Sequence, residues 1–403
     1  MLEALQRKNK PIIYLMLSKI NFLMNKIYLF TAAFAVMASL SGCSDTELAS
    51  IDTAQEKTPI GFHTVGSQMG SRATSINSTN LTDYSFNVYA FTRKDDGTDG
   101  DPFMGTKNTG ATTDDGVNIS YKEGKWNYTT PTDLKYWPTG SLNFYAVSPV
   151  SDTNFYSWEI SQNKKEIHYA SHDEYDDPTF PYVDVMYAIA TGQRKADNGG
   201  TVKLQFRHIT SQIVFMAKKQ SIPNMYVEIK SIKLHNFKHS GTFTIPTDGS
   251  EPQQFNWSYK TLPTKEPNYV IKDQKIVVKN DATDISERTP MFLIPQKLDN
   301  RWNISHNIKT ADANNESYLS IECKISIDGS YRLGSESDYG TLYVPFEADW
   351  QPGKRYVYTL VFGGGYDADG HTILQPIDFD ASVGNWGNDD GTTTTDKDIP
   401  LYQ

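Results

Sequence analysis

The chain has 403 residues and a formal net charge of −10 at pH 7. That length accommodates two or three domains of about 150 residues each. Residues 1–42 hold five Lys and Arg against one Glu, so their charge is +4 and residues 43–403 carry −14. An acidic body of this kind lacks the positive surface that binds phosphate backbones, so no nucleic-acid partner is expected.

The first element in chain order is a predicted signal peptide that begins at Met24. A short basic start, an apolar stretch and the closing sequence Leu40-Ser41-Gly42-Cys43 have the layout of an exported precursor. The closing tetrapeptide resembles a bacterial lipobox, in which the cysteine is acylated and becomes the mature N-terminus. A transmembrane helix over residues 11–42 is disfavoured because polar residues interrupt a span that needs about 20 apolar residues. We therefore predict lipid attachment at Cys43, with residues 1–23 as an upstream extension.

The cysteine count agrees with a lipidated N-terminus. Cys43 and Cys323 are the two cysteines of the chain. If Cys43 carries lipid, Cys323 has no partner within the chain, so no disulfide is expected. Cys323 lies in the inward phase of the alternating stretch 319–327, which predicts a small buried hydrophobe rather than a nucleophile.

Strand signals dominate the chain after residue 43. Stretches 84–91, 142–147 and 355–362 are aromatic on both phases, which predicts strands covered on both faces. Turn residues separate such strands at the spacing of antiparallel sandwiches, and Pro352-Gly353 predicts a hairpin with the strand at 343–346. The polar stretch 193–200 is the predicted boundary between two all-β domains that meet at residues 197 and 198.

Two loops superficially match ligand-binding motifs. Residues 363–368 fit G-x-G-x-x-A after a strand, but no helix signal follows, so a glycine-rich hairpin is predicted instead of a phosphate site. Residues 94–101 hold four carboxylates from Asp95 onward, yet the Glu that closes an EF-hand loop is missing. A solvated loop is favoured there, and adventitious Ca²⁺ is the alternative.

Two histidine pairs have the spacing that binds metal on a helix. His168 and His172 are four residues apart, as are His235 and His239. Both pairs lie in strand or loop context, where that spacing separates the side chains by about 13 Å. No metal, cofactor or catalytic residue is therefore predicted, although a metal-dependent hydrolase around His168 and His172 stays an alternative. The many aromatic residues leave a glycan-binding surface open.

Seven segments, taken in order, resemble the fimbrillin family of Bacteroidales, the subunits of type V pili. They are the lipobox and residues 86–91, 135–149, 184–190, 202–209, 350–362 and 377–386. The resemblance implies two transthyretin-like, Greek-key β-sandwich domains in tandem. It also implies a precursor that reaches the outer membrane as a lipoprotein and is cut by an arginine-specific surface protease after the first strand.

Arg72-Ala73 matches the cleavage position that the resemblance implies. The chain then divides into a lipidated pro-segment at 43–72, an N-terminal sandwich at 73–197 and a C-terminal sandwich with its tail at 198–403. The pro-segment contains a predicted strand at 58–65 with Ile60 and Phe62 on one phase. Its loss would expose apolar side chains beside unpaired backbone groups, which a strand of another subunit could cover by β-augmentation.

The donor of that strand is the least defined part of the prediction. In stalk-type relatives it is a C-terminal segment, and the candidate here is the tail with Ile399 and Leu401. Pro400 removes one ladder hydrogen bond, which counts against it.

These expectations combine into a noncatalytic pilus subunit or tip adhesin of the cell surface. Its expected partners are other pilus subunits, the outer membrane through the lipid anchor, and a host or bacterial surface receptor. The alternative is a permanently anchored outer-membrane lipoprotein that binds glycan or protein ligands.

Overall fold

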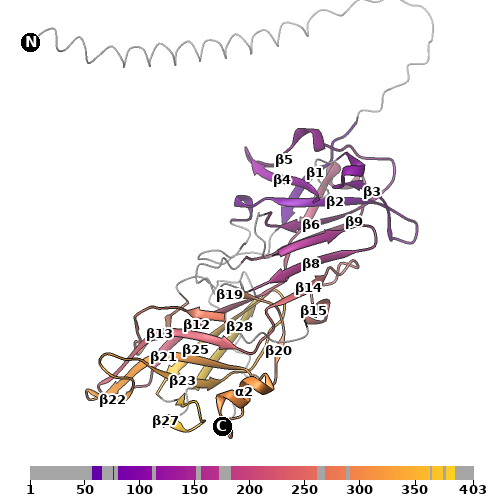
Figure 1. Cartoon of the computed structure of the whole chain (residues 1–403). Coiled ribbons are helices and arrows are strands. Elements are labelled where there is room, and N and C mark those ends of the chain that lie inside the picture. The colour runs from indigo at the N-terminus through magenta and orange to yellow at the C-terminus, as the bar shows by residue number, and fades with distance from the viewer. Residues whose placement is uncertain are drawn as a thin grey trace, which may run out of the picture. The chain divides into compact units, whose positions relative to one another are not determined.

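Strands make up nearly all the regular structure in the computed structural model of the chain (Figure 1). The structure describes residues 57–65, 76, 80–110, 115–150, 156–171, 183–260, 268–286, 291–363, 365–374 and 378–385. The predicted all-β fold class is confirmed. Within the described residues no helix is long and apolar enough to cross a membrane.

A seven-stranded sheet, here called the central sheet, organises the first half of the chain. Its order is β11-β9-β6-β2-β4-β5, with β3 paired to β2. Every residue of β6 and the first six of β2 are buried, as the aromatic residues on both phases predicted. The strands are β2 (Phe86–Arg93), β3 (Asp99–Met104), β4 (Val117–Lys122), β5 (Lys125–Tyr128), β6 (Leu142–Ser148), β9 (Met186–Gln193) and β11 (Arg207–His208).

Two smaller sheets cover the two faces of the central sheet. One is the parallel pair β1 (Gly61–Val65) and β10 (Thr201–Gln205). The other, here called the outer sheet, has the order β15-β14-β8-β7, where β7 is Tyr156–Ile160, β8 is Lys165–Ala170, β14 is Ser240–Thr244 and β15 is Trp257–Tyr259. A separate apolar core lies on each side, so burial on both faces of β2 and β6 follows from three layers.

Strand pairing crosses the predicted boundary at residue 197. Strands β10 and β11, which follow it, pair with β1 and β9, and β14 pairs with β8 (Figure 1). The polar stretch that predicted a linker contains the short 3-10 turn η4 (Asp197–Gly200), which leads directly into β10. A tight turn and a linker have the same polar composition, which is why the sequence pattern does not separate them.

The second half of the chain packs two sheets around one large core. The first has the order β18-β12-β25-β28, with β19 paired to β12; its strands are β12 (Ser211–Lys219), β18 (Thr283–Asp284), β19 (Met291–Leu293), β25 (Lys354–Phe362) and β28 (Asp378–Asn385). The second has the order β16-β13-β21-β23-β26-β27, with β17 paired to β13 and β22 to β21. Its strands are β13 (Met225–His235), β16 (Asn268–Ile271), β17 (Ile276–Val277), β21 (Tyr318–Ile327), β22 (Ser330–Leu333), β23 (Gly340–Pro345), β26 (Gly365–Tyr366) and β27 (Thr372–Leu374).

One predicted hairpin is wrong and one predicted burial is confirmed. The strands before and after Pro352-Gly353 do not pair, because β23 belongs to one sheet of the second half and β25 to the other. The turn therefore carries the chain across the core, after the short ladder of β20 (Lys297–Leu298) with β24 (Ala348–Asp349). Cys323, in the middle of β21, is fully buried as predicted.

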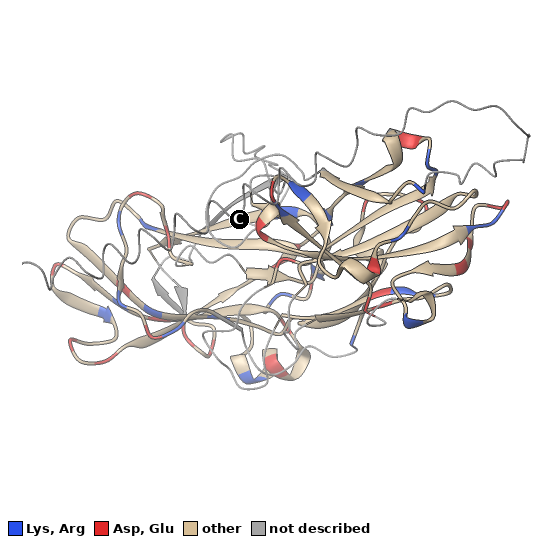
Figure 2. Cartoon of the chain, turned by 90° about the horizontal axis from the view of Figure 1, so that it is seen from above, with Lys and Arg blue, Asp and Glu red and all other residues tan. Residues whose placement is uncertain are grey.

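Short helices close the ends of the sheets. The α-helix α2 (Ile308–Asn314) begins at Asn307, whose side chain accepts the Thr310 N–H, and it ends at Asn315 in a left-handed conformation. The other 3-10 turns are η1 (Leu81–Asp83), η2 (Lys107–Thr109), η3 (Pro131–Asp133) and η5 (Gln254–Asn256). Figure 2 shows acidic and basic residues interspersed along the described strands and turns.

Candidate functional site

Main-chain hydrogen bonds hold both β1 and the residues just before it. It pairs in parallel with β10 over all five of its residues. Just before β1, the Ile60 N–H donates to the Lys135 carbonyl at 2.9 Å, and the Trp137 N–H donates to the Thr58 carbonyl at 3.0 Å. The described chain therefore begins along the segment 135–137 and continues along β10.

The side chains of this segment belong to the core between β1, β10 and the central sheet. Ile60 is 1% exposed and Phe62 is 7% exposed. The Phe62 ring lies against Phe86 and Tyr128, with centroid distances of 6.1 and 5.9 Å. The predicted strand and the shared inward phase of Ile60 and Phe62 are confirmed, while their displacement stays a prediction.

Trp137 forms hydrogen bonds with the residues just before both β1 and β10. Its indole N–H donates to the Gly200 carbonyl at 2.7 Å, in addition to the backbone bond to Thr58. Gly200 has a φ of +82°, and a Cβ there would lie 3.1 Å from the indole nitrogen of Trp137 and from the methyl group of Thr58. The positive φ favours glycine at this point, and a larger residue would also press on Trp137 and Thr58.

Ile76 is the next described residue after β1, and it is anchored in the same core. Its side chain is 1% exposed, and its N–H donates to the Asp184 carboxylate at 2.7 Å. The other carboxylate oxygen of Asp184 lies 2.7 Å from Nδ1 of the buried His208. Sequence reasoning missed this anchor, although Ile76 and Met69 are the two large apolar residues in the run of small and polar residues at 66–80.

Several predicted site residues lie outside the described residues. These are Cys43, Arg72, Ala73, Ile399 and Leu401. The described chain stops at the end of β1, before Arg72, and is next described at Ile76. Near the other terminus, β28 is the last described strand and pairs with β25 in antiparallel register. The tail that contains Ile399 and Leu401 follows β28 in the sequence.

The acidic loop at 94–101 is organised by its own hydrogen bonds. Asp96 accepts the backbone N–H and the hydroxyl of Thr98 at 2.9 and 2.6 Å. Asp99 turns inward and forms a buried ion pair with Lys165 at 2.7 Å. Two of the four carboxylates are thus used by the fold, which weakens the Ca²⁺ alternative.

Of the histidines in the two pairs, His168 and His235 lie on strands of different sheets. His168, on β8, has Nδ1 2.9 Å from the Thr242 hydroxyl, and His172 lies outside the described residues. His235, on β13, stacks on Tyr318 at 4.3 Å and has Nε2 2.7 Å from the Ser320 hydroxyl. The structural contacts of His168 and His235 are those of side chains that pack between strands.

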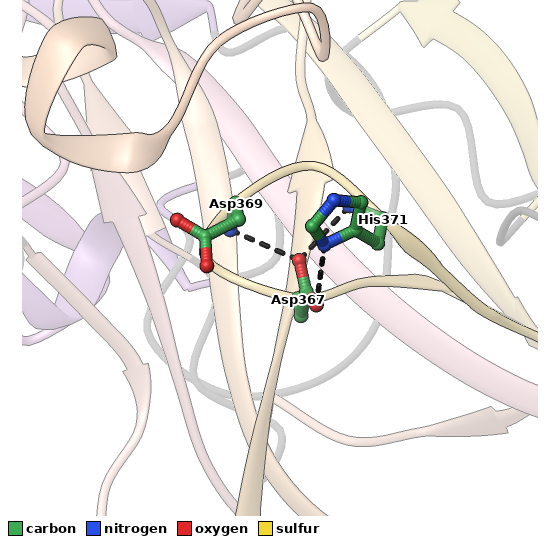
Figure 3. Close-up of side chains that lie close together, drawn as sticks. All are labelled: Asp367, Asp369 and His371. Carbon is green, nitrogen blue, oxygen red and sulfur yellow. Dashed lines mark hydrogen bonds and ion pairs between the residues drawn. The ribbon is translucent and has the colours of Figure 1, made fainter.

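A different group of three potential metal ligands occurs among the described residues, at the turn between β26 and β27 (Figure 3). Asp367 accepts the backbone N–H groups of Asp369 and His371, each at 2.9 Å, and its other oxygen lies 3.2 Å from Nδ1 of His371. These contacts shape an exposed turn. The antiparallel pairing of β26 with β27 confirms the glycine-rich hairpin predicted for this region.

Together these features describe an all-β protein of packed sheets. Its first described strand, β1, is buried in a core and is followed in the sequence by a polar segment. The model of the fimbrillin-like family matches residues 71–386, which is most of the chain. The chain belongs to the fimbrillin-like family. No curated protein matches it by sequence.

Solved structures of proteins from Bacteroides species are similar to this chain. A fimbrial protein from Bacteroides vulgatus is 15% identical, with a TM-score of 0.50, and the match covers 81% of this chain and 99% of that chain. A candidate cell adhesion protein from Bacteroides ovatus is 14% identical, with a TM-score of 0.40 and coverages of 82% and 98%. Another from Bacteroides uniformis is 13% identical, with a TM-score of 0.40 and coverages of 81% and 99%.

Proposed function

We propose that the chain is a subunit of a surface pilus, exported as an outer-membrane lipoprotein through Cys43 and assembled by strand exchange after cleavage at Arg72. Membership of the fimbrillin-like family supports a role in a fimbrium. One structural observation carries the strand exchange: β1 is packed as part of the core, yet it connects to the following chain only through residues 66–75, which include Arg72.

Cleavage in this segment separates two parts of one core. The part before the cut contains Ile60, Phe62 and the lipid anchor, and the part after it begins near Ile76. Because Ile76 is bound through its backbone to Asp184 and through its side chain to the core, the new N-terminus stays in place while β1 leaves. One cut therefore releases the subunit from the membrane and frees the edge of β10.

A strand that binds the freed site must have the same features as β1. It offers unpaired backbone groups along β10 and apolar side chains such as Phe86, and burying each apolar side chain of the incoming strand contributes about 1.5–3 kcal/mol. An incoming strand recovers both the ladder hydrogen bonds and the apolar burial that β1 provided. The tail with Ile399 and Leu401 is the proposed donor, since it follows β28 and alternates apolar residues.

The tandem arrangement belongs to the same proposal. The N-terminal sandwich at 73–197 and the C-terminal sandwich at 198–403 are then two modules, of which the second lends β10, β11, β14 and β15 to the sheets of the first. The two modules therefore share sheets within one chain.

N-terminal mass mapping of protein released from the cell surface tests the cleavage. The expected mature chain begins at Ala73. A lipid-bearing Cys43 at the N-terminus of all mature protein would contradict the proposal and indicate the permanently anchored lipoprotein instead.

Polymer formation on cells tests the consequence of the cut. Arg72→Ala is expected to abolish polymers, whereas Arg332→Ala, at an exposed arginine of β22, is the matched control and should leave them unchanged. Polymers of normal length and number in the Arg72→Ala strain would refute cleavage at this site.

A further inference from the structure

A buried polar triad lies between the central sheet and the outer sheet. Lys165 extends from β8, and its Nζ lies 2.7 Å from Oδ2 of Asp99 on β3. The other oxygen, Oδ1, accepts a hydrogen bond from Nδ2 of Asn143 on β6 at 2.8 Å. The side chains of Lys165 and Asp99 are each 6% exposed, and Asn143 is 1% exposed. The Tyr145 hydroxyl also donates to Oδ1 at 3.2 Å, so a single carboxylate contacts an amine, an amide nitrogen and a phenol away from water.

The surroundings of the amine are aromatic. The Lys165 Nζ lies 4.6 Å from the ring centroid of Phe91 and 4.7 Å from that of Tyr145. The two rings cover the amine and keep water away from it. Proton transfer from Lys165 to Asp99 creates the nucleophilic amine without a net change of charge in the site.

The amine is also fixed in direction. Its remaining N–H groups donate to the carbonyls of Ser161 and Gln162, in the turn that precedes β8. When Asp99 takes the third proton, those two hydrogen bonds hold the amine, and the lone pair is left on the side of Asp99. A fixed nucleophile lowers the entropic part of the barrier to reaction with a neighbouring group.

The amide of Asn143 is held in the orientation that such a reaction needs. Its carbonyl oxygen accepts the Gly192 N–H at 2.9 Å, which polarises the carbonyl and would stabilise negative charge on that oxygen. Its nitrogen donates to Asp99 and to the Gly97 carbonyl at 3.2 Å. The potential leaving nitrogen therefore faces the acid, and the oxygen faces a hydrogen-bond donor.

We propose that Lys165 and Asn143 form an intramolecular isopeptide bond, with Asp99 as the proton carrier. The Nζ of Lys165 attacks Cγ of Asn143, so the Nζ–Cγ bond forms and the Cγ–Nδ2 bond breaks. Asp99 accepts one proton from Nζ before the attack and a second one after it, and it delivers both in turn to Nδ2, which leaves as ammonium while the carboxylate is restored. The reaction needs no oxidant, reductant or cofactor. The new bond covalently joins β8 of the outer sheet to β6 of the central sheet.

The mass of the intact chain under denaturing conditions tests the bond directly. The expected mass is lower than the sequence mass by about 17 Da, the mass of one ammonia, and a protease digest should contain one branched peptide that joins Lys165 to Asn143. An unaltered mass with two separate peptides would overturn the proposal. A loss of about 18 Da with Lys165 joined to Asp99 would overturn Asn143 as the acceptor.

Two substitutions assign the roles. Lys165→Arg and Asp99→Asn should each give a chain of full sequence mass, because one lacks the nucleophile and the other lacks the proton carrier. Lys164→Arg is the matched control, since Lys164 is exposed and pairs with Glu159, and it should keep the loss of ammonia. Retention of the loss in Asp99→Asn would exclude Asp99 as the carrier. The wild-type mass and digest decide the bond itself even if a variant fails to fold.

Discussion

The ring of Phe62 meets the ring of Phe144 edge-on, with centroids 6.2 Å apart and planes at 80°. Phe62 lies on β1, the strand proposed to leave, and Phe144 lies on β6 at the centre of the central sheet. The contact shows that β1 is part of the core and not an appended edge. If β1 leaves, as proposed, apolar side chains and backbone groups of the core become exposed. A strand of another subunit that covers them would then be bound favourably.

The first prediction concerns the stability of the uncleaved chain. Phe62→Ala is expected to lower the free energy of unfolding by about 3–5 kcal/mol, because it removes a buried ring that contacts three aromatic rings. Urea unfolding followed by far-UV circular dichroism measures the change. Phe255→Ala is the control, since Phe255 is 82% exposed and its loss should change the free energy by less than about 0.5 kcal/mol. Equal effects of the two substitutions would mean that β1 is not packed.

The second prediction concerns the vacated site. A chain cut between Val65 and Ile76 and separated from its N-terminal fragment should bind a synthetic peptide of residues 57–65, because the peptide restores both the pairing with β10 and the burial of Phe62. Isothermal titration calorimetry measures the affinity. A peptide with Ile60→Asp and Phe62→Asp should not bind, since each change places a charge in the apolar core. Binding of both peptides alike would show that the interaction is not the proposed insertion.

The third prediction concerns acid stability. Burial of the imidazole lowers the pKa of His235 to about 4, with Lys233 acting in the same direction and Asp312 opposing it. In the unfolded chain the pKa of this histidine is about 6.5, so the unfolded chain binds the proton more tightly than the folded chain. The contribution of neutral His235 to the free energy of unfolding is therefore fully present above pH 6.5 and is lost as the pH falls from 6.5 toward 4. The loss should reach about 2–3 kcal/mol.

His235→Phe separates this contribution from that of the carboxylates. The variant keeps a ring to stack on Tyr318 but cannot titrate. The difference in unfolding free energy between wild type and variant, measured in urea at several pH values, should change between pH 6.5 and 4 and be constant above pH 7. A difference that is constant over the whole range would show that His235 does not titrate in this interval.

Local patterns predicted local structure in this chain. The alternation in residues 319–327 predicted β21 and the burial of Cys323, and the shared phase of Ile60 and Phe62 predicted their inward orientation. These predictions succeed because side chains alternate between the two faces of a strand, whatever its partners are. A separate local signal, the glycine-rich run at 363–368 with no helix signal after it, predicted a hairpin, and β26 pairs with β27.

These local patterns did not predict which strands pair when they are far apart in the sequence. Nothing in the sequence of β1 indicates that it pairs with β10 in parallel, because the pairing depends on how the whole sheet is assembled. The turn at Pro352-Gly353 reverses the chain as predicted by its residues, but it joins different sheets rather than a hairpin. The triad of Asp99, Asn143 and Lys165 was missed for the same reason, since its members come from three strands of two sheets.

The last prediction concerns the thiol of Cys323. The side chain is 0% exposed in the middle of β21, between the paired residues Ile229 and Gly340 of the neighbouring strands, and burial raises the pKa of the thiol. The thiolate is the reactive form, so iodoacetamide at pH 8 should leave Cys323 unmodified in the folded chain and modify it fully in denaturant. Peptide mass spectrometry at this residue measures the modified fraction over time. Because β21 lies between β13 and β23, modification requires opening of the sheet, and its rate should rise with urea in parallel with unfolding. Rapid modification without denaturant would show that this sheet opens independently of the rest of the core.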